Sequence, residues 1–145
     1  MDRKDAGLPA IRFAAHLCGT RCQEVLNGNS KYVQFLSSIG FQRVQVNATV
    51  INGVDRSNKD EWVSNIVTCM REVKNIEWII QANEETNDVL VTPLEELLSP
   101  PKNMVILFDA SCGTDVTATE FNLPNNKEIR CGYAGGIGPD NMMDI

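Results

Sequence analysis

The sequence from Asn103 to Asn141 decides the fold: NMVILFDASCGTD is followed, after a polar link, by IRCGYAGGIGPDN. Met104 to Phe108 are apolar without alternation, which is typical of a strand buried on both faces of a parallel sheet. That strand ends in a carboxylate, Asp109. A second strand is predicted from Ile129 to Ala134, and a glycine-rich turn follows it directly.

The glycine-rich turn has the composition of an anion-binding site. Gly135, Gly136 and Gly138 allow the backbone to adopt positive φ and its N–H groups to approach a ligand closely. An acid and a glycine turn at the ends of two strands are typical of α/β barrels, whose sites lie at the carboxyl ends of the strands. We therefore expect the turn to hold a phosphate group beside Asp109.

The rest of the chain alternates strands with helices at a period of about 30 residues, the length of a βα unit. Strands are predicted to begin near residues 12, 43, 76, 104 and 129. This pattern predicts one α/β domain, residues 1–145, with a parallel sheet of about five strands and right-handed crossover helices. Two architectures fit the pattern, an open doubly wound sheet or part of a closed barrel.

Two of the predicted helices rest on local signals. Residues 58–74 carry apolar side chains at three- and four-residue steps, and Ser57 with Asp60 is expected to cap that helix. A short helix over residues 93–98 is predicted from a capping signature that begins at Thr92.

Composition and charge exclude several classes of partner. The net charge is -6, and the Lys and Arg residues are scattered, so no nucleic acid or anionic membrane partner is expected. No apolar run approaches the roughly 18 residues needed to span a bilayer, and the amino terminus lacks the apolar region of a signal peptide. The five cysteines are expected to be free thiols in a reducing compartment, which favours a cytoplasmic protein.

Three segments together resemble one enzyme family. They are VQVNA (44–48), LFDA (107–110) with Gly113 and Thr114 after it, and AGGIGPDN (134–141). They look like the fourth, sixth and seventh strands of phosphoribosylanthranilate isomerase, a (β/α)8-barrel enzyme of tryptophan biosynthesis. The resemblance covers strands three to seven of such a barrel.

The resemblance implies an Amadori rearrangement, which converts an aldose phosphoribosyl-amine into a ketose without a cofactor. Asp109 would be the general acid that protonates the ring oxygen so that the sugar opens, a contribution of about 10²–10⁴ in rate. The glycine turn would hold the phosphate of the substrate, and Gly113 and Thr114 would line the same site.

The chain also departs from the family. Asn47 stands where the fourth strand has histidine, and Asp115 stands at the last glycine of the Gly-Gly-Thr-Gly loop that follows the sixth strand of the family. Asn47 and Gln81 end predicted strands and are expected to contact substrate hydroxyls. A closed barrel needs about 200 residues, so we interpret the chain as a fragment, a truncated product or a diverged relative, and expect it to be inactive by itself.

Cys18 is the candidate general base, because it stands at the end of the first predicted strand. His16 precedes it by two residues and shares its side of the strand. With Cys22 these residues could form a His-x-Cys-x₃-Cys metal site, but no second ligand pair has suitable spacing. We therefore prefer a buried structural role and expect no metal.

Two other functions fit the sequence. One is a non-catalytic, truncated α/β domain that pairs its open sheet edges with a second copy of itself. The other is a different sugar-phosphate-binding barrel enzyme, such as an epimerase or a synthase, that shares only the glycine turn.

Overall fold

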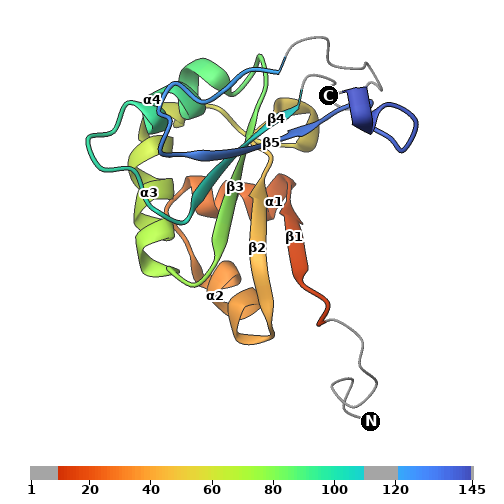
Figure 1. Cartoon of the computed structure of the whole chain (residues 1–145). Coiled ribbons are helices and arrows are strands. Elements are labelled where there is room, and N and C mark those ends of the chain that lie inside the picture. Colours follow the sequence, from red (N-terminus) through yellow and green to blue (C-terminus); the bar gives the residue numbers. More distant parts are fainter. Residues whose placement is uncertain (1–9, 110–120, 145) are drawn as a thin grey trace.

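The computed structural model describes residues 10–109 and 121–144, and a parallel sheet forms their centre (Figure 1). Its strands are β1 (Phe13–Leu17), β2 (Phe41–Val46), β3 (Glu77–Ala82), β4 (Met104–Asp109) and β5 (Arg130–Ala134). They are hydrogen-bonded in the order β1-β2-β3-β4-β5, and each neighbouring pair is parallel. The predicted α/β class with a parallel sheet of five strands is therefore confirmed for the described residues.

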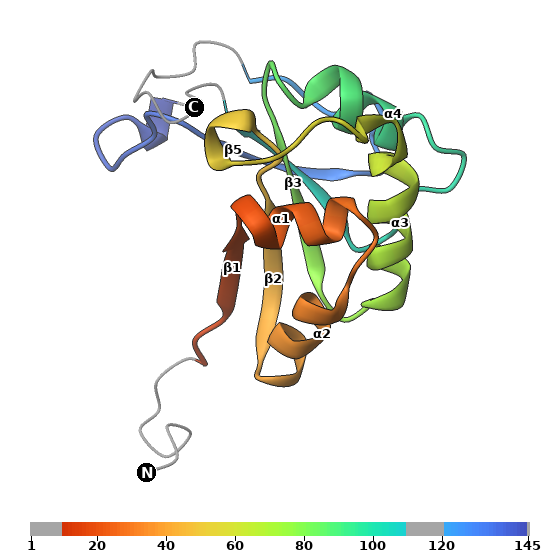
Figure 2. The ribbon, with the colours of Figure 1, turned by 180° about the vertical axis from the view of Figure 1, so that it is seen from behind.

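The strand order distinguishes a doubly wound sheet from a singly wound sheet. A doubly wound sheet reverses its direction at one point, whereas here each strand lies beside the one that precedes it in the chain. Right-handed crossovers in this order put the helices on one face. Figure 1 has α1 (Gly19–Leu26), α2 (Lys31–Ser38) and α3 (Trp62–Glu72) behind the sheet, and Figure 2 has them in front. The other face of the sheet carries no helix of the described residues.

The hydrophobic core lies between the sheet and the helices that cover one of its faces. Successive strand residues point to opposite faces, so every second side chain of β2, β3 and β4 meets the helices. These side chains are fully or almost fully buried: Val44, Val46, Trp78, Ile80, Met104 and Ile106. The two tryptophans, Trp62 on α3 and Trp78 on β3, are both 0% exposed, as the sequence predicts.

The segment before α3 differs from the prediction. A 3-10 turn, η3 (Lys59–Glu61), precedes the helix. The predicted capping pair is wrong, because Ser57 donates its backbone N–H and its hydroxyl to the carboxylate of Asp55 instead. The local Asp-x-Ser turn thus competes with the cap for the same side chain.

The short helix after β3 also begins earlier than predicted. A π-helical turn, η4 (Asn87–Val91), leads without interruption into α4 (Thr92–Glu95). Thr92 is therefore not an N-cap, because the residue before it is already helical. The loop before η4 is closed by the side chains of Asn83 and Thr86, which satisfy its backbone groups.

Short helical turns complete the described elements: η2 (Val50–Asn52) after β2 and η5 (Met142–Asp144) after β5. None of the helices in the described residues is long and apolar enough to cross a membrane. β1 and β5 form the two edges of the sheet. Their expected pairing with a second copy of the chain stays a prediction.

A charged cluster joins the amino-terminal ends of the strands on the helix-free face. Arg43 Nε on β2 donates to Glu77 Oε1 on β3 at 2.8 Å, and an Arg130 guanidinium nitrogen on β5 donates to Glu77 Oε2 at 2.7 Å. Burial by itself would raise the pKa of Glu77, but the hydrogen bonds and charges of the two arginines outweigh it and lower that pKa. The cluster therefore stabilises the fold where Glu77 is ionised.

Replacing Glu77 with glutamine is expected to lower the free energy of unfolding by about 1 kcal/mol at pH 7, since it removes a partly exposed double ion pair. Because folding lowers the pKa of Glu77, the ion pairs stabilise the protein fully at pH values above the ordinary pKa of 4.5. This stability is lost as the pH falls through the pKa of Glu77 in the folded protein. The difference between wild type and Glu77→Gln should thus shrink below about pH 4.5, as measured by urea unfolding. Exposed Glu84→Gln is the control, and a difference that is independent of pH would contradict the interpretation.

Candidate functional site

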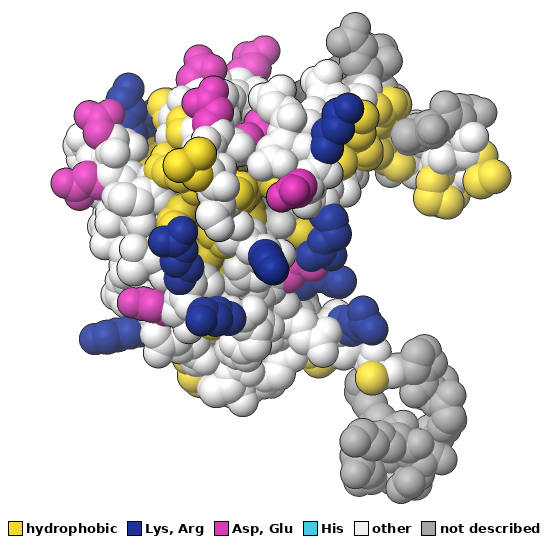
Figure 3. Space-filling model, turned by 60° about the vertical axis from the view of Figure 1, so that its left-hand side comes forward, with side chains coloured by type: hydrophobic (Ala, Val, Ile, Leu, Met, Phe, Trp, Pro, Cys, Tyr) yellow, Lys and Arg dark blue, Asp and Glu magenta, His cyan; other side chains and the backbone are white. Residues whose placement is uncertain are grey.

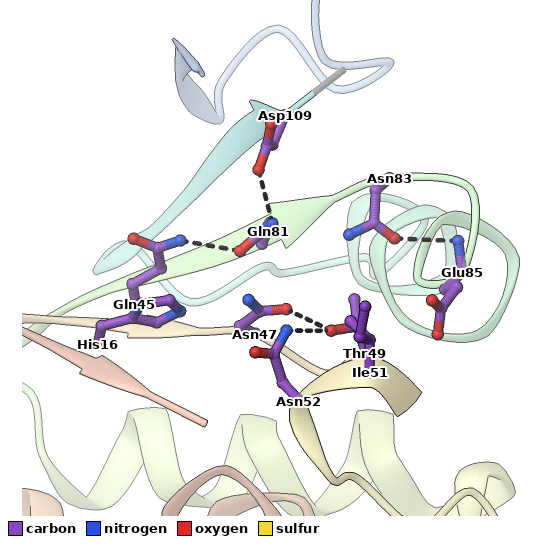
Figure 4. Close-up of a pocket in the computed structure, with 10 residues that line it drawn as sticks. All are labelled: His16, Gln45, Asn47, Thr49, Ile51, Asn52, Gln81, Asn83, Glu85 and Asp109. Carbon is purple, nitrogen blue, oxygen red and sulfur yellow. Dashed lines mark hydrogen bonds between the residues drawn. The ribbon is translucent and has the colours of Figure 1, made fainter. Parts of the chain in front are cut away.

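A pocket of about 500 Å³ opens at the carboxyl ends of β1 to β4, on the helix-free face (Figure 4). Its volume is in the range of small-molecule sites. Almost every side chain that lines it is polar. The lining residues are His16, Gln45, Asn47, Thr49, Ile51, Asn52, Gln81, Asn83, Glu85 and Asp109.

A directed row of hydrogen bonds crosses three strands of this pocket. Gln45 Nε2 donates to Gln81 Oε1 at 2.9 Å, and Gln81 Nε2 donates to Asp109 Oδ2 at 2.9 Å. Because Asp109 Oδ2 accepts from Gln81, the oxygen of the Gln81 amide faces Gln45, so Asp109 fixes which way both amides point. Figure 4 shows the row running along the strand ends.

A second set of hydrogen bonds shapes the loops above β2 and β3. Thr49 Oγ1 donates to Asn47 Oδ1 at 2.9 Å and accepts from Asn52 Nδ2. Glu85 Oε2 accepts the backbone N–H of Val50 at 2.9 Å, which links the two loops. Asn47 is 6% exposed and lines the pocket, so the structure brings this predicted contact residue to the same place as Asp109.

Asp109 and the glycine turn lie at the same edge of the sheet. β4 and β5 are parallel neighbours, and Asp109 is in register with Ala134, the residue before the turn. Gly135 and Gly136 have φ values of 101° and 64°, so both adopt the left-handed conformation that favours glycine. The acid and the two glycines are thus adjacent, although no glycine of this turn is among the described residues that line the pocket.

The third glycine of the turn, Gly138, is engaged in a local hydrogen bond. The N–H of Gly138 donates to Asn141 Oδ1 at 2.7 Å, and Asn141 Nδ2 donates to the carbonyl of Gly136. No regular helix begins at Pro139; a turn leads into the short η5. A helix amino terminus, which would favour a bound phosphate, is therefore reduced to one turn here, and Gly138 is engaged elsewhere.

Cys18 does not line the pocket that holds Asp109. It is exposed at the amino-terminal cap of α1, while His16, two residues earlier, does line the pocket. Cys22 is fully buried, and burial raises the pKa of its thiol to about 12. Within residues 10–109 and 121–144 no three His, Cys, Asp or Glu side chains form a group that could hold a metal ion. The predicted contacts Gly113 and Thr114 lie outside the described residues.

Basic side chains gather at the opposite end of the sheet. A cleft of about 340 Å³ there is lined by Arg43, Lys74, Lys102 and Arg130 around Glu77. Figure 3 shows Lys and Arg side chains across the lower part of one side of the molecule and most Asp and Glu side chains near the top. The carboxyl-end pocket has no Lys or Arg in its described lining, so an anionic group there would depend on N–H donors of the backbone and of side-chain amides.

Sequence reasoning missed the loop residues of the pocket. The sequence patterns single out none of Thr49, Asn83 and Glu85. Their signal was positional, because they follow directly on parallel strands whose carboxyl ends share one edge.

Comparison of the chain with protein-family models, with curated proteins and with solved structures gives no match. The resemblance to phosphoribosylanthranilate isomerase thus stays a prediction. The geometry of the pocket and of the glycine turn is therefore the basis for inferring what the protein does.

Proposed function

We propose that the protein binds a sugar phosphate at the carboxyl edge of its sheet and acts as a phosphoribosylanthranilate isomerase-like enzyme, in place of the inactivity expected from the sequence, because a candidate acid, Asp109, and a candidate base, His16, line one pocket. One observation carries the proposal: Asp109 is in register with the residue before Gly135 and Gly136 on a parallel neighbouring strand. A carboxylic acid and a backbone phosphate cradle are therefore within reach of one small substrate. The barrel enzymes that handle phosphorylated sugars use this edge for binding and chemistry.

The helix-free face supports a barrel-type sheet. In α/β barrels the inward side chains form layers, and each layer takes its members from alternate strands. Here Glu77 on β3 meets Arg130 on β5 across the intervening β4. Ile79, Val105 and Leu107 occupy the middle of this face, and the amide row with Asp109 lies at its carboxyl end. We propose that this face is part of a barrel interior.

The chemistry needs one acid and one base. Asp109 would protonate the ring oxygen of a phosphoribosyl-amine, which breaks the bond from that oxygen to C1 and leaves a protonated Schiff base. A base then removes the C2 proton and delivers it to C1 of the resulting enol-amine, while the C2 hydroxyl gives its proton to the Asp109 carboxylate, which yields the ketose amine and restores both groups. Imidazole is the commonest general base, and His16 lines the pocket, so His16 takes this role in the proposal in place of Cys18.

The proposal is tested by binding and by turnover. Titration of ¹⁵N-labelled protein with ribose 5-phosphate should shift the backbone amides of Gly135 and Gly136, while the amide of Gly40, at the other end of the sheet, stays in place. Addition of phosphoribosylanthranilate should be followed by loss of its fluorescence. Unmoved Gly135 and Gly136 amides at millimolar ligand would remove the phosphate site, and binding without turnover would favour the non-catalytic alternative.

A further inference from the structure

Asn83 carries an amino group that the fold leaves without a partner. The residue follows β3, is 6% exposed and lines the pocket. Its Oδ1 accepts the backbone N–H groups of Glu85 at 2.9 Å and of Thr86 at 3.2 Å. These two donors fix the orientation of the amide, because a flipped side chain would set its own N–H groups against them. Asn83 Nδ2 then has no hydrogen-bond partner among the described residues.

The loop holds this amide rigidly. Thr86 is fully buried; its hydroxyl accepts the backbone N–H of Asn83 at 3.0 Å and donates to the carbonyl of Gln81 at 2.7 Å. A buried donor without a partner is unfavourable, so we expect the Asn83 amino group to meet an acceptor that is not one of the described residues. Figure 4 shows the nitrogen of Asn83 pointing away from Glu85, on the side of Gln81 and Asn47.

A second amide faces the same space. Asn47 Oδ1 accepts the hydroxyl of Thr49, whose oxygen is in turn held by Asn52 Nδ2. The amino group of Asn47 therefore lies on the opposite side of its amide, toward Gln81 in Figure 4. Two side-chain amino groups from the ends of adjacent strands thus converge on one pocket.

The charges of the pocket restrict what these amino groups can bind. Glu85 and Asp109 are both in the lining, and its described part contains no Lys or Arg. An anionic oxygen would lie beside both carboxyl groups, and Arg56, which pairs with Glu85 at 3.9 Å, is not among the described residues that line the pocket, so the arrangement is unfavourable in a partly enclosed site. A hydroxyl suits the lining better, since it accepts from an amide and donates to a carboxylate.

We infer that Asn83 is a ligand-binding residue that donates to an uncharged hydroxyl oxygen, and that the pocket recognises the polyhydroxyl part of a sugar. The inference rests on the sugar-phosphate site proposed above and gives it a direction: the hydroxyl groups lie toward β2 and β3, and the phosphate lies toward β5.

The test uses the isosteric change Asn83→Asp. The new side chain keeps an oxygen for the N–H groups of Glu85 and Thr86, so the loop is retained, but it replaces the donor in the pocket with an acceptor. The matched control is Asn87→Asp, the same change at an exposed residue of η4 that does not line the pocket. Thermal unfolding of both variants checks that the fold is kept.

The probes are ribose, ribose 5-phosphate and inorganic phosphate, with the side-chain amide signal of Asn83 and the backbone signals of Gly135 and Gly136 as readouts. Ribose and ribose 5-phosphate should shift the Asn83 signal and inorganic phosphate should not, and Asn83→Asp should weaken binding of both sugars at least about tenfold, as expected for one lost hydrogen bond. The inference would be overturned, while the proposed function stands, if ribose 5-phosphate shifted the signals of Gly135 and Gly136 but not that of Asn83. It would also be overturned if ribose 5-phosphate bound the Asn83→Asp variant as tightly as the Asn87→Asp variant. Ribose that moves Asn83 while no phosphate moves the glycines would support it and remove the phosphate site.

Discussion

Replacement of Trp78 with alanine is expected to lower the free energy of unfolding by about 3–5 kcal/mol, because it opens a large cavity at the centre of the core. Trp78 lies on the central strand, in register with Val44 on one side and Met104 on the other, and is 0% exposed. A domain of this size has only about 5–15 kcal/mol of stability, so the loss is a large share of the total. Denaturant unfolding followed by circular dichroism measures it.

Two further variants separate packing from hydrogen bonding. The indole N–H of Trp78 donates to the carbonyl of Val73 at 3.3 Å, but Asn103 Nδ2 also donates to that carbonyl. Trp78→Phe should therefore cost much less than Trp78→Ala, since it keeps an aromatic ring and leaves Val73 with a partner. Leu98→Ala is the surface control, because Leu98 is fully exposed. A loss near that of Leu98→Ala would show that β3 is not the centre of the fold.

The fold could be predicted because its signals are local. An apolar run such as Met104 to Phe108 indicates a buried strand, and the helical spacing of Trp62, Ile66 and Met70 indicates α3. Strand order could not be predicted, because an alternation of strands and helices with right-handed crossovers fits both a doubly wound sheet and a barrel-type sheet. Prediction of caps failed where side chains had competing partners: Glu95, the glutamate of the capping signature that begins at Thr92, accepts hydrogen bonds from Asn125 instead. Such partners are distant in sequence, so no local pattern contains them.

The candidate site could be predicted only in part. The positions of Asp109 and of the glycine turn follow from two parallel strands that end at one edge. The row from Gln45 through Gln81 to Asp109 depends on register, which places Val44 beside Trp78 and Ile80 beside Ile106. If the register were shifted by one residue, these polar side chains would face the core. The burial of the alternate residues rules out such a shift, but this is known only once the pairing of the strands is known. The unpartnered amino group of Asn83 needs the three-dimensional loop.

In the proposed reaction, Asp109→Asn is expected to lower turnover of a phosphoribosyl-amine by about 10²–10⁴, or about 3–5 kcal/mol in the barrier. Asparagine keeps an oxygen for the hydrogen bond from Gln81, so the amide row and the pocket stay in place while the transferable proton is lost. Binding of ribose 5-phosphate should change little, which confines the effect to the chemical step. Asp88→Asn, the same change at an exposed residue of η4, is the control and should leave turnover unchanged. If Asp109→Asn turned over at the wild-type rate, another group would have to donate the proton. Removing the general acid from an otherwise unchanged site must lower the rate.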